Sequence, residues 1–387
     1  MSLRDLLITQ ELAKIDTPAY YFDIDKFNQS ILQTKNKYKN IPLTFSIKAN
    51  PFLVGAINDK LEYVEVCSPG ELEICIKNKI APNRIIYSGV NKGYIDVKRA
   101  ITYGVEIVTA ESINHLETEQ AVAKEQNIIQ KVILRLTSGN QFGMSKECIF
   151  NIIDHKQKYP NIDFWGIHYY SGTQKKFRQI KKDVEELSAV LDELKENHSY
   201  KPHIVEYGPG LSVDYFDVKS KLADNNTIDE TLELITEFAE KYPLGIEMGR
   251  FLASDCGIFA TRIVDKKTND GINYLICDGG IHQLKYYGQT MAMQIPQIQV
   301  MNKSEGIKQK YCLCGSLCTV ADVMVREVEL PDVEIGDVLL FFKCGAYSMT
   351  ESSLMFLSRD LPNVYVYREK HGITQVRKNI CTYDFNM

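Results

Sequence analysis

The sequence has no hydrophobic run long enough to cross a lipid bilayer. A transmembrane helix needs about 18 or more consecutive apolar residues, and the 387 residues, 44% of them hydrophobic, contain no such run. The N-terminal segment MSLRDLLITQELAKIDTP carries acidic residues early and lacks the apolar core of a secretory signal. We therefore expect no membrane partner and a cytoplasmic protein.

A concentrated basic surface is also missing. The chain has 45 Lys and Arg against 50 Asp and Glu, a net charge of −5, and its basic residues are dispersed. Nucleic-acid-binding proteins instead gather Lys and Arg on one face. No nucleic-acid partner is expected. No G-x-G-x-x-G motif follows the first expected strand, which argues against a nucleotide-binding oxidoreductase.

The ten cysteines show no disulfide framework and no metal-binding pattern. Cys67, Cys75 and Cys277 lie inside apolar runs, as reduced and buried thiols do. The C-x-C-x-x-x-C cluster at 312–318 has no second pair of Cys or His nearby at the spacing of a structural zinc site. We therefore expect no metal.

Short apolar runs alternate eight times with helical patterns over residues 24–253. Nearly continuous apolar runs of four to six residues are typical of parallel strands that are covered on both faces. Eight regular units favour a closed (β/α)8 TIM barrel over an open doubly wound sheet. The expected strands are Leu43–Ile47, Tyr63–Val66, Arg84–Ser88, Val105–Thr109, Val132–Thr137, Phe164–Tyr169, His203–Glu206 and Leu244–Glu247.

Two helices between these strands have clear sequence signals. Ser68-Pro69-Gly70-Glu71 has a helix-capping residue, Pro at the first helical position and Glu three residues after the cap. A second helix has apolar residues spaced 3-4-3-4-3, which places them in one stripe facing the core. The stripe consists of Phe177, Ile180, Val184, Leu187, Leu191 and Leu194.

The remainder of the chain, 1–23 and 254–387, is expected to form an all-β domain of the barrel or sandwich type. Its turns include Asn269-Asp270-Gly271, and helical stripes are few. Ala19–Asp23 is expected to add a strand to this domain. The other expected strands are Ala260–Val264, Tyr274–Cys277, Gln309–Leu313, Met324–Leu330, Val338–Phe342 and Val364–Arg368.

Chemically active residues of such a barrel belong at the C-terminal ends of its strands. Lys48 follows the first strand, where partial burial would lower its pKa and favour attack on a carbonyl. Taken alone, such a lysine more commonly opens a surface loop. The seventh and eighth strands end in Glu206-Tyr207-Gly208-Pro209-Gly210 and Glu247-Met248-Gly249-Arg250, where glycine amides and an arginine can hold a phosphate. A lysine, a phosphate cradle and a carboxylate together indicate a pyridoxal phosphate (PLP) site.

Seven motifs occur in the order found in one enzyme family. They are SIKAN around Lys48, EVCSPGEL (65–72), GIHYYSGTQ (166–174), GPGL, EMGR, GSLCTVAD (315–322) and Gly345-Ala346-Tyr347. On these motifs the chain resembles the fold-type III PLP-dependent decarboxylases, which include ornithine, arginine and diaminopimelate decarboxylases. The resemblance covers roughly residues 17–370 and implies an alanine racemase-like barrel.

The resemblance also implies residue roles and an assembly. Lys48 corresponds to the lysine that holds PLP as a Schiff base, Glu247 to the carboxylate facing the pyridine nitrogen, and Cys318 to the catalytic acid that protonates the carbanion. The implied cofactor-binding residues are Lys48, Tyr170, Thr173, Gly208, Gly210, Glu247, Gly249, Arg250 and Tyr347. The family forms homodimers with shared active sites, because the cysteine segment crosses the dimer interface. Simpler alternatives are an ion pair of Glu247 with Arg250 and a merely packed Cys318.

Two departures from the diamine-forming relatives bear on the substrate. Tyr170 replaces the histidine that usually stacks on the cofactor, and His168 lies two residues earlier. Thr319 replaces the acidic residue that binds the distal amine of basic substrates, which argues against free lysine, ornithine or diaminopimelate. With GNQFGM (139–144) and DGGIH…GQ (278–289), the chain looks most like a subgroup that decarboxylates a glutamyl unit tethered to an acyl carrier protein, the butirosin type. Thr319, His168 and Asp322 are tentative substrate contacts.

Other functions remain open at this point. A siderophore-pathway decarboxylase of a citryl-diaminopropionate-like conjugate is the nearest alternative, followed by a diaminopimelate or ornithine decarboxylase. An amino-acid racemase matches the EMGR and Cys318 segments poorly. An inactive regulatory homologue that binds a decarboxylase is disfavoured, because Lys48, Glu247, Arg250, Cys318 and Tyr347 are all present.

Overall fold

The computed structural model describes residues 2–9, 15–57, 60–216, 225–303 and 307–387. The chain forms two compact units. The first consists of Ile31–Val213 and a later segment that ends at Phe251, and it contains the barrel. The second consists of the chain up to Ser30, a short segment that begins at Asp214, and Leu252–Met387.

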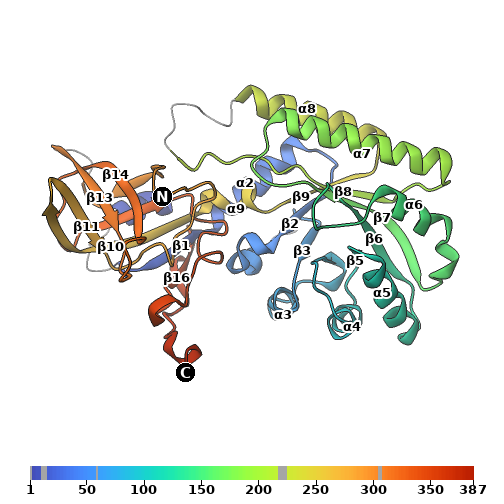
Figure 1. The fold of residues 1–387 in the computed structure, drawn as a ribbon, viewed down its shortest axis with the longest axis horizontal. Helices are drawn as coiled ribbons and strands as arrows, with labels where there is room; N and C mark the ends of the chain where they lie inside the picture. The colour runs from blue at the N-terminus through green and yellow to red at the C-terminus, as the bar shows by residue number, and fades with distance from the viewer. Residues whose placement is uncertain (1, 10–14, 58–59, 217–224, 304–306) are drawn as a thin grey trace. The chain divides into compact units, whose positions relative to one another are not determined.

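Eight parallel strands close into a barrel in the first unit (Figure 1). The ring is complete because the last strand pairs with the first, with Thr44 beside Glu247. Each strand lies within two residues of a predicted one at both ends, so the TIM-barrel prediction is confirmed. The strands are β2 (Leu43–Ser46), β3 (Tyr63–Val66), β4 (Ile85–Tyr87), β5 (Ile107–Ala110), β6 (Gln130–Leu136), β7 (Ile162–Tyr170), β8 (Ile204–Gly208) and β9 (Leu244–Met248).

Helices lie before, between and after the barrel strands, and those between the strands cover the barrel on the outside (Figure 1). They are α2 (Ile24–Lys37), which begins in the second unit, α3 (Pro69–Lys77), α4 (Tyr94–Tyr103), α5 (Ile113–Glu125), α6 (Lys146–Asp154), α7 (Phe177–Asn197), α8 (Asn225–Lys241) and α9 (Arg250–Ala253). Short 3-10 helices are Ile47–Ala49, Pro51–Ala56, Pro82–Arg84, Lys156–Lys158 and, after α9, Ser254–Cys256. The stripe predicted for α7 is buried from Ile180 to Leu194, as its spacing requires.

Two contrasting groups of side chains are buried on the barrel strands. Ile86, Ile107, Ile133 and Ile204 form an apolar cluster. The carboxyl groups of Glu65, Glu206 and Glu247 form an acidic group on β3, β8 and β9. Because alternate residues of a strand share a face, Ile204 and Glu206 of β8 lie on the same face of that strand. β3 and β9, which carry Glu65 and Glu247, both pair with β2.

The second unit is a mixed sheet of nine strands, which confirms the predicted β domain. The strands are β1 (Ala19–Asp23), β10 (Gly257–Asn269), β11 (Ile272–Cys277), β12 (Ile298–Val300), β13 (Lys308–Cys314), β14 (Val323–Pro331), β15 (Val338–Phe342), β16 (Asn363–Arg368) and β17 (Gly372–Arg377). As predicted, β1 joins this sheet, between β10 and β16. Helix α1 (Leu3–Thr9) packs its buried Leu3 and Leu7 into the same core, and short 3-10 helices lie at Phe356–Ser358 and Tyr383–Phe385.

Two strands of this sheet were not predicted from the sequence. β12 has only three residues, and β17 has no buried side chain. The Ile-Gln-Val alternation of β12 is too short to predict a strand, and β17 has no buried face that would give an apolar pattern. The predicted turn between β10 and β11 is present, with positive φ values of 50° at Asp270 and 78° at Gly271, as a two-residue hairpin turn requires.

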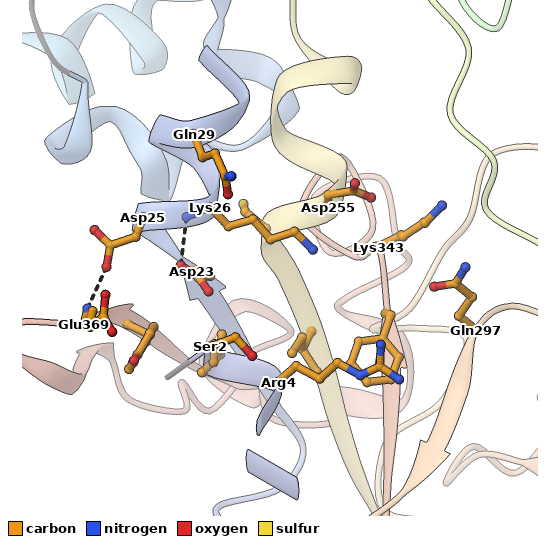
Figure 2. Close-up of a pocket in the computed structure, with 15 residues that line it drawn as sticks. Ser2, Arg4, Asp23, Asp25, Lys26, Gln29, Asp255, Gln297, Lys343 and Glu369 are labelled. Atoms are coloured by element: carbon orange, nitrogen blue, oxygen red, sulfur yellow. Dashed lines mark hydrogen bonds between the residues drawn. The ribbon is translucent and has the colours of Figure 1, made fainter. Parts of the chain in front are cut away.

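The β unit contains a surface pocket of about 720 Å³ (Figure 2). Its charged lining is mixed: Arg4, Lys26 and Lys343 face Asp23, Asp25, Asp255 and Glu369. Such a lining favours neither an anion nor a cation, and the pocket includes no residue that the sequence placed in the active site. In the described part of the chain, no helix is both long and apolar enough to traverse a membrane.

Candidate active site

Lys48 lies where β2 ends, in the 3-10 helix Ile47–Ala49. Its amine points to carboxylates of two neighbouring strands: the Nζ atom is 2.9 Å from Glu65 Oε2 and 3.7 Å from Glu247 Oε1. The Lys48 side chain is 36% exposed, whereas those of Glu65 and Glu247 are 3% and 6% exposed. The amine therefore reaches solvent at the barrel mouth while it is held by buried anions.

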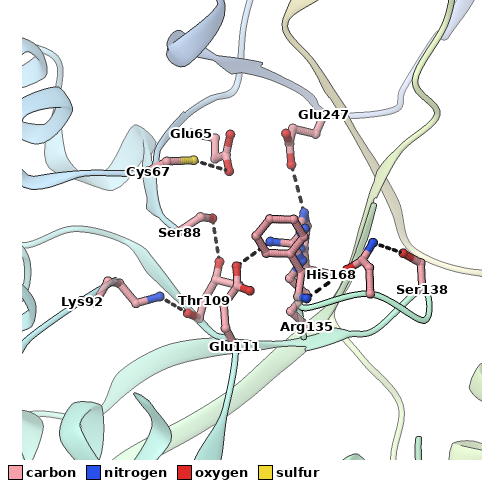
Figure 3. Close-up of polar contacts among 12 residues, drawn as sticks. Glu65, Cys67, Ser88, Lys92, Thr109, Glu111, Arg135, Ser138, His168 and Glu247 are labelled. Carbon is pink, nitrogen blue, oxygen red and sulfur yellow. Dashed lines mark hydrogen bonds and ion pairs between the residues drawn. The ribbon is translucent and has the colours of Figure 1, made fainter. Parts of the chain in front are cut away.

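Glu247, on β9, has polar partners at both of its carboxyl oxygens. Ser46 Oγ donates to its Oε1 at 2.5 Å, and His168 Nε2 lies 3.0 Å from its Oε2 (Figure 3). Burial alone would raise the pKa of Glu247, but Lys48, His168 and Ser46 together hold the pKa well below the ordinary value. Glu247 is thus ionised at the pH of a cell, and His168 is placed as its partner.

Glu65 and Cys67 complete the surroundings of the lysine amine. The Cys67 thiol donates to Glu65 Oε1 at 3.0 Å and lies 3.5 Å from Lys48 Nζ. Burial, with Glu65 beside it, raises the pKa of Cys67 well above its usual value, so the sulfur remains a neutral thiol. The predicted cap of α3 fixes this segment, because Ser68 Oγ accepts from the Glu71 amide and Glu71 accepts from the Cys67 amide.

The chain turns after β8 and β9 at glycines that pack too closely against their neighbours for a side chain to fit. A side chain at Gly210, whose φ is +61°, would place its Cβ 2.1 Å from the Gly172 carbonyl oxygen. A Cβ at Gly249 would lie 3.1 Å from that of Ala49. Arg250 adds a guanidinium beside these turns, with its Nε donating to Thr173 Oγ1 at 3.2 Å. Close backbone approach together with an arginine is the chemistry that a phosphate requires.

Tyr170 is the last residue of β7 and belongs to the same group of side chains. Its ring packs so closely on Gly208 that a Cβ there would be 2.5 Å from the ring atom Cδ2. Burial raises the pKa of Tyr170, while the nearby cations Lys48 and Arg250 act to lower it. The structure thus brings together Lys48, Glu247, His168, Tyr170, Thr173, Arg250 and the three glycines 208, 210 and 249.

Several side chains at this site were not predicted from the sequence. No role was predicted for Ser46, Cys67 or Glu65. The signal for Glu65 was its carboxylate within a short apolar strand, because a buried charge needs a partner. Polar residues at the ends of β4 to β6 were also not predicted (Figure 3). There Arg135 pairs with Glu111 at 2.5 Å, Ser88 and Thr109 share a hydrogen bond of 2.9 Å, and Lys92 donates to the Thr109 carbonyl.

Four sequence-predicted residues lie in the β unit, where they are described by their own surroundings. Cys318 is exposed and precedes Thr319. The buried Asp322 accepts from the amides of Ile281 at 2.9 Å and Leu317 at 2.7 Å, so its carboxylate stabilises the loop. Tyr347 has a positive φ of 64°. Their roles in the reaction stay predictions.

Comparisons with known proteins agree with this geometry. The model of the family "Pyridoxal-dependent decarboxylase, pyridoxal binding domain" matches residues 24–254. A 2-[(L-alanin-3-ylcarbamoyl)methyl]-2-hydroxybutanedioate decarboxylase of Staphylococcus aureus is 26% identical, over 87% of this chain and 90% of its own length. The L-glutamyl-[BtrI acyl-carrier protein] decarboxylase of Niallia circulans is 25% identical, over 94% and 91%.

Solved structures share the fold at lower identity. Diaminopimelate decarboxylase from M. jannaschii superposes with a TM-score of 0.85 at 21% identity, over 96% of this chain and 92% of that one. Lysine/ornithine decarboxylase from Vibrio vulnificus gives 0.82 at 19%, over 95% and 100%. The matched segment is a pyridoxal-binding domain, and the lysine, carboxylates and glycine turns fit that cofactor. The chain therefore belongs to the family of pyridoxal-dependent decarboxylases.

Proposed function

We propose that this PLP-dependent amino-acid decarboxylase acts on a conjugated or carrier-protein-linked amino acid of glutamyl type, rather than on a free diamino acid. The observation that carries the decarboxylase part is the position of the Lys48 amine, 2.9 Å from Glu65 and 3.7 Å from Glu247 at the barrel mouth. The observation that carries the substrate part is a neutral residue, Thr319, directly after Cys318.

Each residue of the barrel site has a physical task. Lys48 supplies the amine that binds the cofactor's aldehyde carbon, and Glu65 and Cys67 hold that amine in place. The glycine turns and Arg250 bind the phosphate, and the Tyr170 ring offers a face for stacking. PLP, when bound, supplies the electron sink for the carbanion left by departing CO2.

Glu247 and Cys318 have the two proton-related tasks. Glu247, kept ionised by Lys48, His168 and Ser46, holds a proton on the pyridine nitrogen through its negative charge. Cys318 donates a proton to the substrate carbon from which CO2 departs. In this proposal Cys318 reaches the site of a second copy, so the enzyme is a homodimer with shared active sites, and Tyr347 contributes to phosphate binding.

The substrate class follows from what Thr319 lacks. A carboxylate at this position would pair with the ammonium group of lysine, ornithine or diaminopimelate, and such a contact strongly discriminates among substrates. Threonine offers only a hydroxyl, which suits an amide, thioester or carboxylate instead. Two of the relatives above act, by their names, on substrates without a free distal amine, one carrier-linked and one a hydroxybutanedioate conjugate. His168 and Asp322 are the other expected substrate contacts, but His168 is engaged with Glu247 and Asp322 with the loop amides, which favours Thr319.

A substrate panel tests the proposal. CO2 release is measured with L-glutamyl-loaded acyl carrier protein, the citryl-diaminopropionate-like conjugate, and free ornithine, lysine and diaminopimelate. We expect turnover of a conjugate and slow turnover of each free diamino acid. The matched variant is Thr319→Glu, which should improve kcat/KM for the free diamino acids and reduce it for the conjugate.

Contrary outcomes are equally clear. Fast decarboxylation of a free diamino acid by the wild type would overturn the substrate proposal and favour a diaminopimelate or ornithine type. Preference for the citryl conjugate over the carrier-linked glutamyl group would support the siderophore type. Absence of turnover in every case, with no visible absorbance of bound cofactor, would favour an inactive regulatory homologue.

A further inference from the structure

Glu206 is a buried carboxyl group that the site described above does not use. It lies on β8 and is 0% exposed. Neither of its carboxyl oxygens makes a hydrogen bond of normal geometry to the residues that the structure describes. Burial of an ionised carboxylate without partners is among the most costly arrangements in a protein. The group therefore has to be either neutral or paired, and its surroundings decide which.

The strand register places Glu206 next to the catalytic carboxylate. Glu206 is the partner of His168 on β7 and of Gly245 on β9. Gly245 is two residues before Glu247 and shares its face, because side chains alternate along a strand. The charged and titratable groups that influence Glu206 are Glu247 and Glu65, both like-charged, and the more weakly acting Lys48. Tyr63 lies nearby on β3 and is influenced by Glu206 in turn.

The two neighbouring acids differ sharply in their partners. Glu247 has the Ser46 hydroxyl at 2.5 Å, His168 Nε2 at 3.0 Å and Lys48 Nζ at 3.7 Å. Glu206 has only the nearby Thr44 hydroxyl, whose effect is smaller than that of burial. When two carboxylates share a poorly solvated space, one of them retains a proton. The proton belongs on the acid with fewer donors around it, which is Glu206.

A count of charges leads to the same assignment. Three carboxyl groups, Glu65, Glu206 and Glu247, are buried and influence one another. Even with His168 protonated, only Lys48 and His168 oppose them among the groups just named. The Lys48 amine must moreover become neutral to act as a nucleophile, which removes one of the two positive charges. If Glu206 keeps its proton, it adds no further negative charge to this group when the Lys48 amine becomes neutral.

We propose that Glu206 is a positioning residue that holds a proton inside the barrel, so that Glu247 keeps its negative charge when the Lys48 amine becomes neutral. Burial and the repulsion from Glu247 and Glu65 raise the pKa of Glu206 well above its usual value, in agreement with this geometry. Glu206 does not touch the reacting atoms. It acts by remaining uncharged beside Glu247.

Infrared spectroscopy of the protein without substrate tests the proton directly. We expect the carbonyl band of protonated carboxylic acids at neutral pH in the wild type, and we expect part of this band to be lost in Glu206→Gln. Glutamine has nearly the same shape but no acidic proton. Glu119, whose pKa burial raises to about 7, adds to the same band, so the difference between the two spectra is the measurement. Glu117→Gln, at an exposed position on α5, is the matched control and should leave the band unchanged. Identical bands in the wild type and Glu206→Gln would overturn the proposal.

The pH dependence of stability gives a second test on the cofactor-free protein. A folded-state pKa above the unfolded value, about 4.3 for Glu, means that unfolding releases a proton at higher pH. Stability from this group is therefore fully present below the unfolded pKa and is lost as pH rises towards the folded pKa. We expect the difference in Tm between Glu206→Gln and the wild type to shift in favour of the variant as pH rises. The difference between Glu117→Gln and the wild type should stay constant with pH. A constant difference between Glu206→Gln and wild type would contradict the proposal.

The activity profile connects the proton to the reaction, and this test alone rests on the proposed function. In the wild type, ionisation of Glu206 at alkaline pH places a second negative charge beside Glu247 and should reduce kcat/KM. We expect the alkaline limb to move to higher pH in Glu206→Gln, an effect that a purely structural residue would not produce. An unmoved limb, with the infrared and stability results as expected, would confine Glu206 to a buried neutral acid and overturn its positioning role.

Discussion

Two groups of side chains buried on the barrel strands have opposite chemistry. In the apolar cluster, Ile86, Ile107, Ile133 and Ile204 stabilise the fold by excluding water. In the acidic group, the carboxyl groups of Glu65, Glu206 and Glu247 are buried on β3, β8 and β9. Buried carboxylates cost free energy. The comparison teaches that the apolar cluster maintains the fold, whereas the acidic group lowers stability and controls the charge around Lys48.

The largest effect that distinguishes the acidic group from the apolar cluster is expected for Lys48→Ala. Without the amine, the cofactor has no covalent attachment and decarboxylation should fall to background. Loss of the visible absorbance of bound PLP and of CO2 release are the measurements. Lys182→Ala, a lysine with a 74% exposed side chain on α7, is the control and should retain both. Retained turnover in Lys48→Ala would contradict the assignment of the acidic group around Lys48 to the active site.

Glu247→Gln should be next in magnitude. It keeps the shape but removes the charge, and loss of one preorganised electrostatic contact typically costs about 10²–10³-fold in kcat. The pKa of Glu247 is lower in the folded protein than in the unfolded chain. The stability that its charge contributes is therefore present above the unfolded pKa and is lost as pH falls through the folded-state pKa. The acid limb of Tm against pH should accordingly flatten in the variant. Glu237→Gln, exposed on α8, should change neither measurement.

In the apolar cluster, Ile107→Ala should lower the free energy of unfolding without a specific effect on the decarboxylation rate. Ile107 is 0% exposed, and truncation of a buried isoleucine costs about 2–5 kcal/mol through lost burial and the cavity left behind. Denaturant unfolding of the cofactor-free protein measures the change. Ile129→Ala, at a position that is 70% exposed, should stay within about 0.5 kcal/mol of wild type. Equal losses in the two variants would refute the contrast.

The smallest expected effect concerns the phosphate turn. The added methyl group of Gly208→Ala would lie 2.5 Å from the Tyr170 ring and force it to move. Overpacking of this kind costs about 1–3 kcal/mol, so PLP should bind about tenfold or more weakly by titration of the apoenzyme. Gly70→Ala is the control, since its nearest neighbour would be 3.9 Å away. Unchanged PLP affinity in Gly208→Ala would show that the ring moves without cost to the cofactor site.

The sequence predicted much of this fold because barrel strands and helices carry strong local patterns. All eight barrel strands and the stripe of α7 follow from apolar periodicity. β12 and β17 did not, since one is three residues long and the other is solvent-facing. Among site residues, the lysine and the glycine turns were predicted from their place at strand ends. Ser46, Cys67 and Glu206 were missed, because their importance lies in what faces them across the barrel.

By itself, the amino-acid sequence determined the alternation of strands and helices, the lysine at the end of β2 and the glycine-rich turns at the ends of β8 and β9. These features depend on neighbours a few residues apart along the chain. Only the tertiary structure decided which carboxylates surround that lysine. Barrel closure brings Ser46 within 2.5 Å of Glu247, 201 positions later in the chain, and places Glu206 beside them. Electrostatic energy depends on distance through space and on burial. The charge states of this site therefore follow from the closed barrel and not from positions along the sequence.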